Sequence, residues 1–145
     1  MKKVLLFCCL LLPVSWVSCD KFDLYKNHKL DGMWQLKTVQ DIDGKVVFVD
    51  TIYYSFQRAA VFSFTVLETP THAMQPIYGY VDMPSDDRVH VLIDYNSAKG
   101  GNFEWFHKLS GWSSLDVTFD IKKYNNTDLV LFDSGNGKTY TLKKF

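Results

Sequence analysis

Two tight turns in the last third of the sequence constrain the fold more than any other feature. Three runs rich in β-branched and aromatic residues, SLDVTFDIKKY, DLVLFD and GKTYTLKKF, are separated by Asn125-Asn126-Thr127 and by Ser134-Gly135-Asn136-Gly137. Asn-Gly between such runs is the strongest short hairpin signal that a sequence offers. Two hairpins in series predict three consecutive antiparallel strands at the end of the chain.

The same pattern extends back to residue 33, through MWQLKTVQ, DIDGKVVFV, TIYYSFQR, AAVFSFTVLE, IYGYVDM and RVHVLIDY. Asp43-Gly44 and Pro84-Ser85-Asp86-Asp87 supply the turns of two further hairpins. No βαβ rhythm separates these runs, so we expect one all-β domain with about eight antiparallel strands. Such a meander avoids an exposed edge most completely by closing into an up-and-down barrel, and a sandwich is the alternative.

One stretch, NSAKGGNFEWFHKLSGWSS, fits two secondary structures. Apolar residues recur every third position from Phe103 to Trp112, which suits a short helix that begins at Asn102 and ends at Gly111. They also alternate from Phe103 to Leu109, which suits a strand. Periodicity does not decide so short a run, and we favour a short helix or an irregular segment.

The first 18 residues have the layout of a secretory signal peptide. Lys2 and Lys3 give a basic start, residues 4–12 form an apolar run, and a small, turn-prone segment follows. The run is well short of the roughly 20 residues that a membrane-spanning helix needs. We therefore expect residues 1–18 to be removed on export.

The residues Val17-Ser18-Cys19 resemble the lipobox of bacterial lipoproteins, although Trp16 stands where an aliphatic residue is usual. The resemblance implies that Cys19 becomes the first residue and carries lipid, palmitate among its acyl chains. Several acyl chains would hold a water-soluble domain firmly on a membrane. We expect residues 19–31 to be a lipidated tether with a short turn, residues 32–145 to form the barrel, and the protein to lie in the cell envelope, with the outer membrane favoured.

Composition narrows the classes of partner. The other two cysteines lie in the signal peptide, so the exported domain has neither a disulfide framework nor a cysteine metal site. Without Lys2 and Lys3 it carries 14 basic and 16 acidic residues, which argues against nucleic acid as a partner. Its 21 aromatic residues call for a large core, a lined cavity, or both.

Both ends of the expected barrel resemble the lipocalin-like, or calycin, group. Gly32-Met33-Trp34 is similar to the G-x-W motif that opens the first lipocalin strand, and residues 119–145 are similar to the closing hairpins of small lipocalin-like bacterial lipoproteins. Lipocalins commonly stack an Arg from the last strand on the motif Trp. Here the candidates for that position are Lys122, Lys143 and Lys144, which lack the planar guanidinium. We expect Gly32 and Trp34 to be structural, with Trp34 closing one barrel end.

Ligand-binding candidates are aromatic residues on the expected strands and in the ambiguous stretch. An eight-stranded barrel either fills its interior with side chains or holds one small molecule there. Tyr78 and Tyr80 share a face, and their hydroxyls suit the polar end of an apolar ligand. Phe103 and its neighbours lie between glycines, as in a gate over a cavity. The candidates are Tyr53, Phe62, Phe64, Tyr78, Tyr80, Phe103, Trp105, Phe106 and Trp112.

Catalytic and metal-binding patterns are missing. The four histidines show no H-x-H or H-x₃-H spacing, Glu68 and Glu104 are the only glutamates, and G-x-S-x-G and phosphate-binding glycine motifs are absent. We therefore expect no enzyme, no metal and no cofactor. Two functions remain: non-covalent binding of a small apolar or amphipathic molecule, or docking of a filled barrel on another envelope protein.

Overall fold

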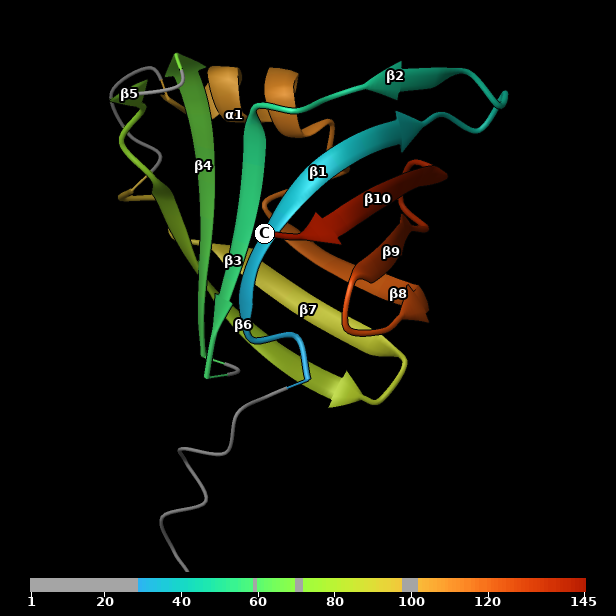
Figure 1. The fold of residues 1–145 in the computed structure, drawn as a ribbon. Helices are drawn as coiled ribbons and strands as arrows, with labels where there is room; N and C mark the ends of the chain where they lie inside the picture. Colours follow the sequence, from blue (N-terminus) through green and yellow to red (C-terminus); the bar gives the residue numbers. More distant parts are fainter. Residues whose placement is uncertain (1–28, 59, 70–71, 98–101) are drawn as a thin grey trace, which may run out of the picture.

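The computed structural model describes residues 29–58, 60–69, 72–97 and 102–145, which form a closed antiparallel barrel (Figure 1). Each wall strand pairs with its neighbours in the order β10-β9-β8-β7-β6-β4-β3-β1, and β1 pairs with β10 to close the ring. The eight wall strands are β1 (Gly32–Gln40), β3 (Ile52–Gln57), β4 (Val61–Thr69), β6 (Ile77–Ser85), β7 (Arg88–Ile93), β8 (Asp116–Tyr124), β9 (Asp128–Asp133) and β10 (Lys138–Lys144). The predicted all-β, up-and-down barrel is confirmed.

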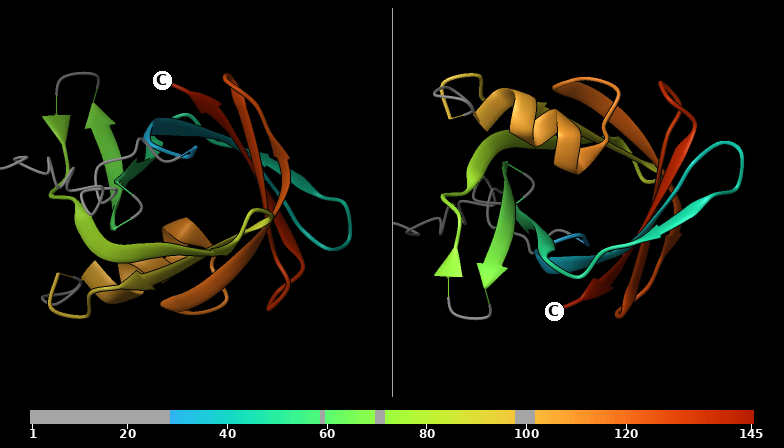
Figure 2. Two further views of the ribbon diagram at one scale, coloured as in Figure 1. Left: turned by 90° about the horizontal axis from the view of Figure 1, so that it is seen from below. Right: turned by 90° about the horizontal axis from the view of Figure 1, so that it is seen from above.

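Three shorter elements lie outside this ring. The strand β2 (Val46–Phe48) pairs with the end of β1, and β5 (His72–Ala73) pairs with the end of β4. The helix α1 (Asn102–Ser110) crosses one end of the barrel, as Figure 2 shows from above. Of the two forms that we favoured, a short helix or an irregular segment, the structure has the helix, and Gly111 follows its last residue with a φ of 64° that suits glycine after a helix.

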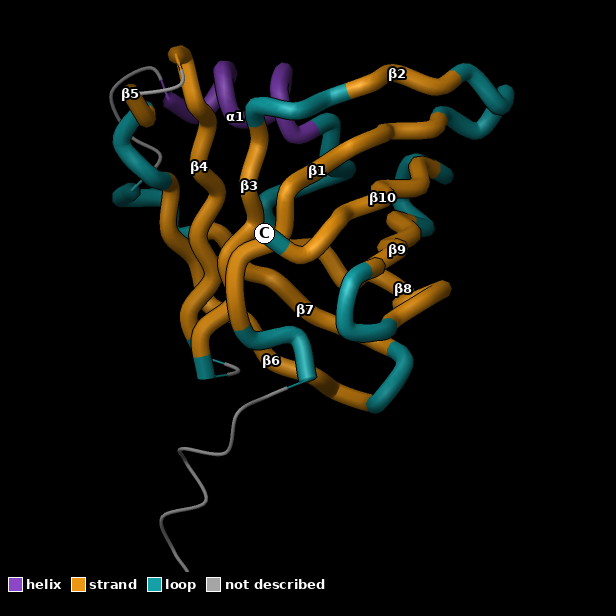
Figure 3. The backbone as a smooth tube through the Cα atoms, in the orientation of Figure 1, coloured by secondary structure: helices purple, strands orange, loops and turns teal. Residues whose placement is uncertain are grey.

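The predicted turns join the strands where the sequence indicated. Gly44 and Gly137 have positive φ values of 86° and 73°, a backbone conformation that residues other than glycine rarely adopt. Residues 125–127 connect β8 to β9, and Asp86 and Asp87 connect β6 to β7. Figure 3 shows these hairpins as short loops between long strands. Local turn chemistry thus fixes most of the neighbour relations in the barrel.

Alternation along the strands places the core inside the barrel. On β7, Val89, Val91 and Ile93 are buried while His90 and Leu92 face outward, as the sequence predicts. The interior is mostly aromatic and aliphatic, and α1 contributes to it from one end. Burial of this single core holds the wall strands together.

Within the described residues, no helix is both long enough and apolar enough to cross a membrane. The expected signal peptide at residues 1–18, the lipidated Cys19 and most of the expected tether lie outside the described residues.

Candidate functional site

Four of the candidate aromatic residues meet inside the barrel. Phe62 and Phe64 project inward from β4, Phe106 comes from α1, and Trp112 follows the helix; each is at most 4% exposed. Ring centroids lie 4.9 Å apart for Phe64 and Phe106 and 5.4 Å apart for Phe62 and Trp112. Their edge-on and tilted packing fills the space that they were expected to line. These residues form the core below α1.

Two buried tyrosines that were not candidates complete this cluster. The Trp112 indole N–H donates to the Tyr54 hydroxyl at 2.9 Å, and the Tyr140 hydroxyl donates to the Gly111 carbonyl at 2.8 Å. Burial raises the pKa of Tyr54 and the pKa of Tyr140 well above the usual value for a phenol, so both hydroxyls stay neutral. The segment after α1 is thereby attached to the barrel wall by polar as well as apolar contacts.

Trp105 and Phe103 lie on α1 at the covered end. Trp105 is half-buried, with its ring edge-on to Phe64 at a centroid distance of 6.3 Å. Phe103 belongs to the helix, but its side chain lies outside the described residues. We expected this segment to form a gate over a cavity. In the described residues it is instead a helix packed on the core.

Tyr53 is buried, at 7% exposure, but it lies on the outer face of β3 and outside the core cluster, so the expectation that it lines the interior is wrong. Tyr54 takes the inward position on β3, and the Tyr53 ring instead contacts Phe145 edge-on at 5.0 Å. The Tyr53 hydroxyl accepts a hydrogen bond from Gln35 Nε2 at 3.0 Å. Side chains alternate between the two faces of a strand. Ile52, Tyr54 and Phe56 are apolar and face the core, so Tyr53 lies on the other face.

Tyr78 and Tyr80 also face outward, at 48% and 64% exposure, so the interior role expected for them is wrong. On β6 the inward positions are Ile77, Gly79 and Val81, and the tyrosines share the outer face with Asp82. They line a hollow of about 210 Å³ on the outer wall together with Val61, Gly79 and Asp94. The charged residue Asp82, two positions after Tyr80, was the sequence signal that this face of the strand is the outer one.

The motif residues lie at the opposite end from α1. Gly32 has a φ of 119°, and a Cβ there would collide with the Lys144 side chain. Trp34 is buried; its indole N–H donates to the Leu30 carbonyl at 2.7 Å, and the Lys144 ammonium lies 4.4 Å from its ring centroid. Of the three lysines considered for the missing arginine, Lys144 thus takes the position over the Trp.

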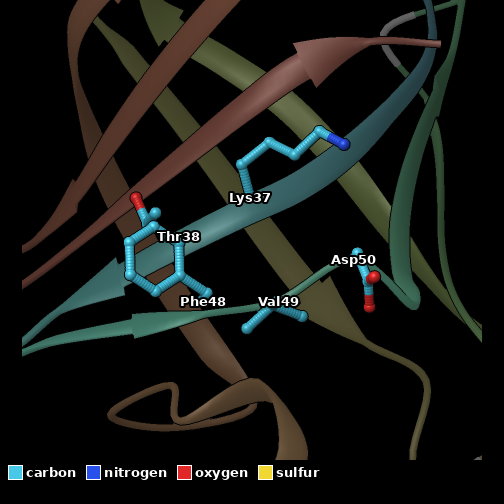
Figure 4. Close-up of a pocket in the computed structure, with 5 residues that line it drawn as sticks. All are labelled: Lys37, Thr38, Phe48, Val49 and Asp50. Carbon is cyan, nitrogen blue, oxygen red and sulfur yellow. The ribbon is translucent and has the colours of Figure 1, made fainter.

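A pocket on the barrel wall was not foreseen. Between Leu36 and Thr38 the pairing of β1 with β10 shifts by one residue, so Lys37 is the extra residue of a bulge. Beside it a pocket of about 390 Å³ opens toward β2 and the connection from β2 to β3 (Figure 4). Its lining residues are Lys37, Thr38, Phe48, Val49 and Asp50.

The pocket joins apolar and charged groups. Phe48 is 83% exposed and lies beside Thr38 in Figure 4, while Val49 packs against the core. The ammonium of Lys37 and the carboxylate of Asp50 add one charge of each sign. Backbone bonds fix the frame, since Val49 N–H donates to the Lys37 carbonyl at 2.8 Å. The volume lies in the usual range of about 300–1,000 Å³ for small-molecule sites.

No sequence signal marks this pocket. The bulge at Lys37 depends on the register between the first and last wall strands, which is a long-range property. Phe48 belongs to a run that reads as an ordinary strand. The exposure of the Phe48 side chain could have been predicted only once β2 was known to lie outside the closed barrel wall.

A second polar arrangement lies on the outer wall. His90 Nδ1 is 2.6 Å from Asp82 and its Nε2 is 2.7 Å from Asp116, so the ring bridges β6, β7 and β8. The hydrogen bonds to Asp116 and Asp82 raise the pKa of His90. In the described part of the chain, no group of three or more His, Cys, Asp or Glu side chains is arranged to hold a metal ion.

Comparisons with known proteins agree with this architecture. A family model described as a lipocalin-like domain matches residues 10–145. A lipocalin-like protein from Bacteroides uniformis superposes with a TM-score of 0.68 at 24% identity, covering 81% of this chain and 100% of that one. An uncharacterized protein from Bacteroides eggerthii gives 0.65 at 25% identity, over 80% and 99%. The search of curated proteins found no match.

Proposed function

Because the chain belongs to the lipocalin-like domain family, we propose that it binds a small amphipathic molecule non-covalently, in the pocket beside Lys37, and performs no chemistry on it. The observation that supports this proposal is the lining of the pocket. The Phe48 ring and Val49 offer apolar surface to one part of a ligand, and the Lys37 ammonium offers an ion pair to an anionic group. The center of the barrel is not the proposed site, since its described aromatic side chains are packed against one another.

A fluorescent anion with an apolar ring system, anilinonaphthalene sulfonate, tests the pocket directly. We expect Phe48→Ala and Lys37→Gln each to weaken its binding about tenfold, which corresponds to roughly 1.4 kcal/mol. Leu92→Ala is the matched control, because it removes an exposed apolar side chain that does not line this pocket. Equal affinity in all four proteins, the wild type included, would exclude this pocket. Native mass spectrometry and solvent extraction of the purified protein would then identify the natural ligand.

We also propose that the barrel is held on a bacterial membrane, with the outer membrane favoured, through lipid on Cys19. The support is the sequence alone: a basic start, a short apolar run and a small residue before the cysteine. Cys19→Ser should abolish incorporation of labelled palmitate and move the protein from the membrane fraction to the soluble fraction. Retention of label in this variant would contradict the proposal.

The filled interior favours a second candidate function, docking on another protein in the envelope. Ile42, Val46, Val47 and Phe48 leave apolar side chains exposed on the hairpin formed by β1 and β2. Exposed apolar surface of this kind commonly marks an interaction site. Crosslinking in intact cells through this hairpin should capture a defined protein, and capture equal to that at the distant Tyr80 would argue against it.

A further inference from the structure

The strand β2, like the two-residue β5, lies outside the closed ring and has one unpaired edge among the described residues. Each wall strand is paired on both sides, whereas β2 pairs only with β1 among the described residues. The hairpin that carries it projects beyond the outline of the barrel (Figures 1 and 2). Val46, Val47 and Phe48 are 43%, 49% and 83% exposed. An exposed apolar edge strand is a template for pairing with another strand.

The hydrogen bonds to β1 define which backbone groups face that open edge. Asp41 N–H donates to the Lys45 carbonyl at 2.8 Å, and Val49 N–H donates to the Lys37 carbonyl at 2.8 Å. In an antiparallel ladder such pairs recur at every second residue, so Val47 also directs its N–H and C=O toward β1. The N–H and C=O groups of Val46 and Phe48 therefore point to the open edge.

We propose that a second copy of this chain pairs with that edge, β2 against β2, with a two-fold axis at Val47. In this antiparallel register Val46 lies opposite Phe48 of the second copy, and Phe48 lies opposite its Val46. The outward N–H and C=O groups of these two residues then form four hydrogen bonds across the axis. Such an interface is isologous, as expected for a symmetric dimer.

The sequence at the flanks suits this register. Lys45 lies opposite Val49 of the second copy, so no like charges face each other across the paired strands. Between Lys45 and Asp50 no proline or charge blocks the edge. The apolar residues that are exposed in one copy cover those of the other.

The paired strands are short, so the dimer is a weak one in free solution. Attachment of both copies to one membrane would raise their effective concentration and favour pairing. The inference rests on the second candidate function, for which it names the partner, and its interface shares Phe48 and Val49 with the pocket of the first.

Analytical ultracentrifugation of the full chain in mild detergent tests the association. We expect a concentration-dependent shift from monomer to dimer that Val46→Lys weakens about tenfold or more. Ile42→Lys, with the same charge on the same hairpin but outside β2, should stay within about twofold of the wild type. A wild type that remains monomeric at every concentration, or equal loss in both variants, would overturn the proposal.

A cysteine test fixes the register. In a chain whose three cysteines are replaced by serine, Val47→Cys places two thiols opposite each other at the axis, within the Cα distance of roughly 4.4–6.8 Å that a disulfide requires. Mild oxidation should crosslink Val47→Cys efficiently and Val46→Cys at least about fivefold less, since the latter thiols lie on the diagonal. A heterologous protein captured through position 47, with no self-crosslink, would overturn the two-fold pairing while supporting the second candidate function.

Discussion

Trp34 shows how single side chains connect the two ends of the barrel domain. Its indole N–H is bonded to the Leu30 carbonyl before the first strand, and its ring lies beneath Lys144 at the end of the last strand. Tyr124 lies against the same ring, with centroids 6.2 Å apart. The side chain therefore joins three segments that are far apart in the sequence.

We expect Trp34→Ala to lower the free energy of unfolding by about 3–5 kcal/mol, the usual cost of cutting a buried aromatic side chain to alanine. Urea titration followed by circular dichroism measures this loss. Tyr80→Ala, which removes an exposed ring, should change stability by no more than about 0.5 kcal/mol. Similar losses in the two variants would show that Trp34 does not close the barrel as described.

Single residues show which side-chain positions could be predicted from the sequence and which could not. Gly32 and Trp34 were placed correctly because a local motif marks them. Tyr53 and Tyr78 were assigned to the wrong face because aromatic character alone does not give strand parity. The more informative signal was the polarity of alternate neighbours, such as Asp82 beside the outward tyrosines of β6.

At the scale of elements, a buried carboxylate attaches the segment after α1 to the hairpin of β9 and β10. Asp133 accepts hydrogen bonds from Ser113 N–H at 2.8 Å, from Ser113 Oγ at 2.9 Å and from Gly135 N–H at 2.8 Å. The carboxylate thus holds the end of the helical segment against the turn at residues 134–137.

Asp133→Asn should therefore destabilise the protein by about 1–3 kcal/mol, because an amide cannot accept all three bonds and leaves a buried donor unpaired. Thermal unfolding monitored by tryptophan fluorescence should detect the loss, since Trp112 adjoins this segment. Asp86→Asn, in an exposed turn, is the control and should be nearly neutral. An unchanged Asp133→Asn variant would assign the attachment to apolar packing instead.

His90 makes the stability of the β6, β7 and β8 wall depend on pH. Its pKa in the folded state is raised above the unfolded value of 6.5 by hydrogen bonds to Asp116 and Asp82. The stabilisation is therefore fully present below about pH 6.5 and is lost as the pH rises through the folded pKa. Because the carboxylates are exposed, the effect should be below about 1 kcal/mol.

Urea midpoints at pH 6 and pH 9 for the wild type and His90→Gln measure this effect. The variant should lose more stability at pH 6 than at pH 9, since only the charged imidazole attracts both carboxylates. Comparing the two proteins at each pH removes contributions from the other titrating groups. An equal difference at both values would assign His90 a purely structural role.

The sequence predicted some features at the scale of elements and missed others, as it did for single residues. The hairpins were foreseen because their turns are local, and the helix was favoured from a three-residue period. The closed ring was inferred from the cost of an open edge. The pocket beside Lys37 could not be foreseen, because a bulge between β1 and β10 depends on pairing across the whole chain.

For the whole molecule, one closed sheet around one core predicts cooperative unfolding. Each wall strand depends on two neighbours, so loss of one strand opens the ring. We expect far-ultraviolet circular dichroism, tryptophan fluorescence and calorimetry to give one coincident transition. Separate transitions for the signals of Trp105 and Trp112 and for the sheet would show that α1 unfolds independently of the barrel.

The pairing that closes the barrel also removes any distinction between its beginning and its end. Trp34 lies opposite Lys144, and the N–H of Phe145 donates to the Met33 carbonyl at 2.9 Å. The two ends of the folded domain are therefore neighbours that a short linker can join. New termini at the exposed turn around Gly44 would then give a circular permutant with the same ring. In topological terms the order of the strands is cyclic, and the position of the chain ends in it is arbitrary.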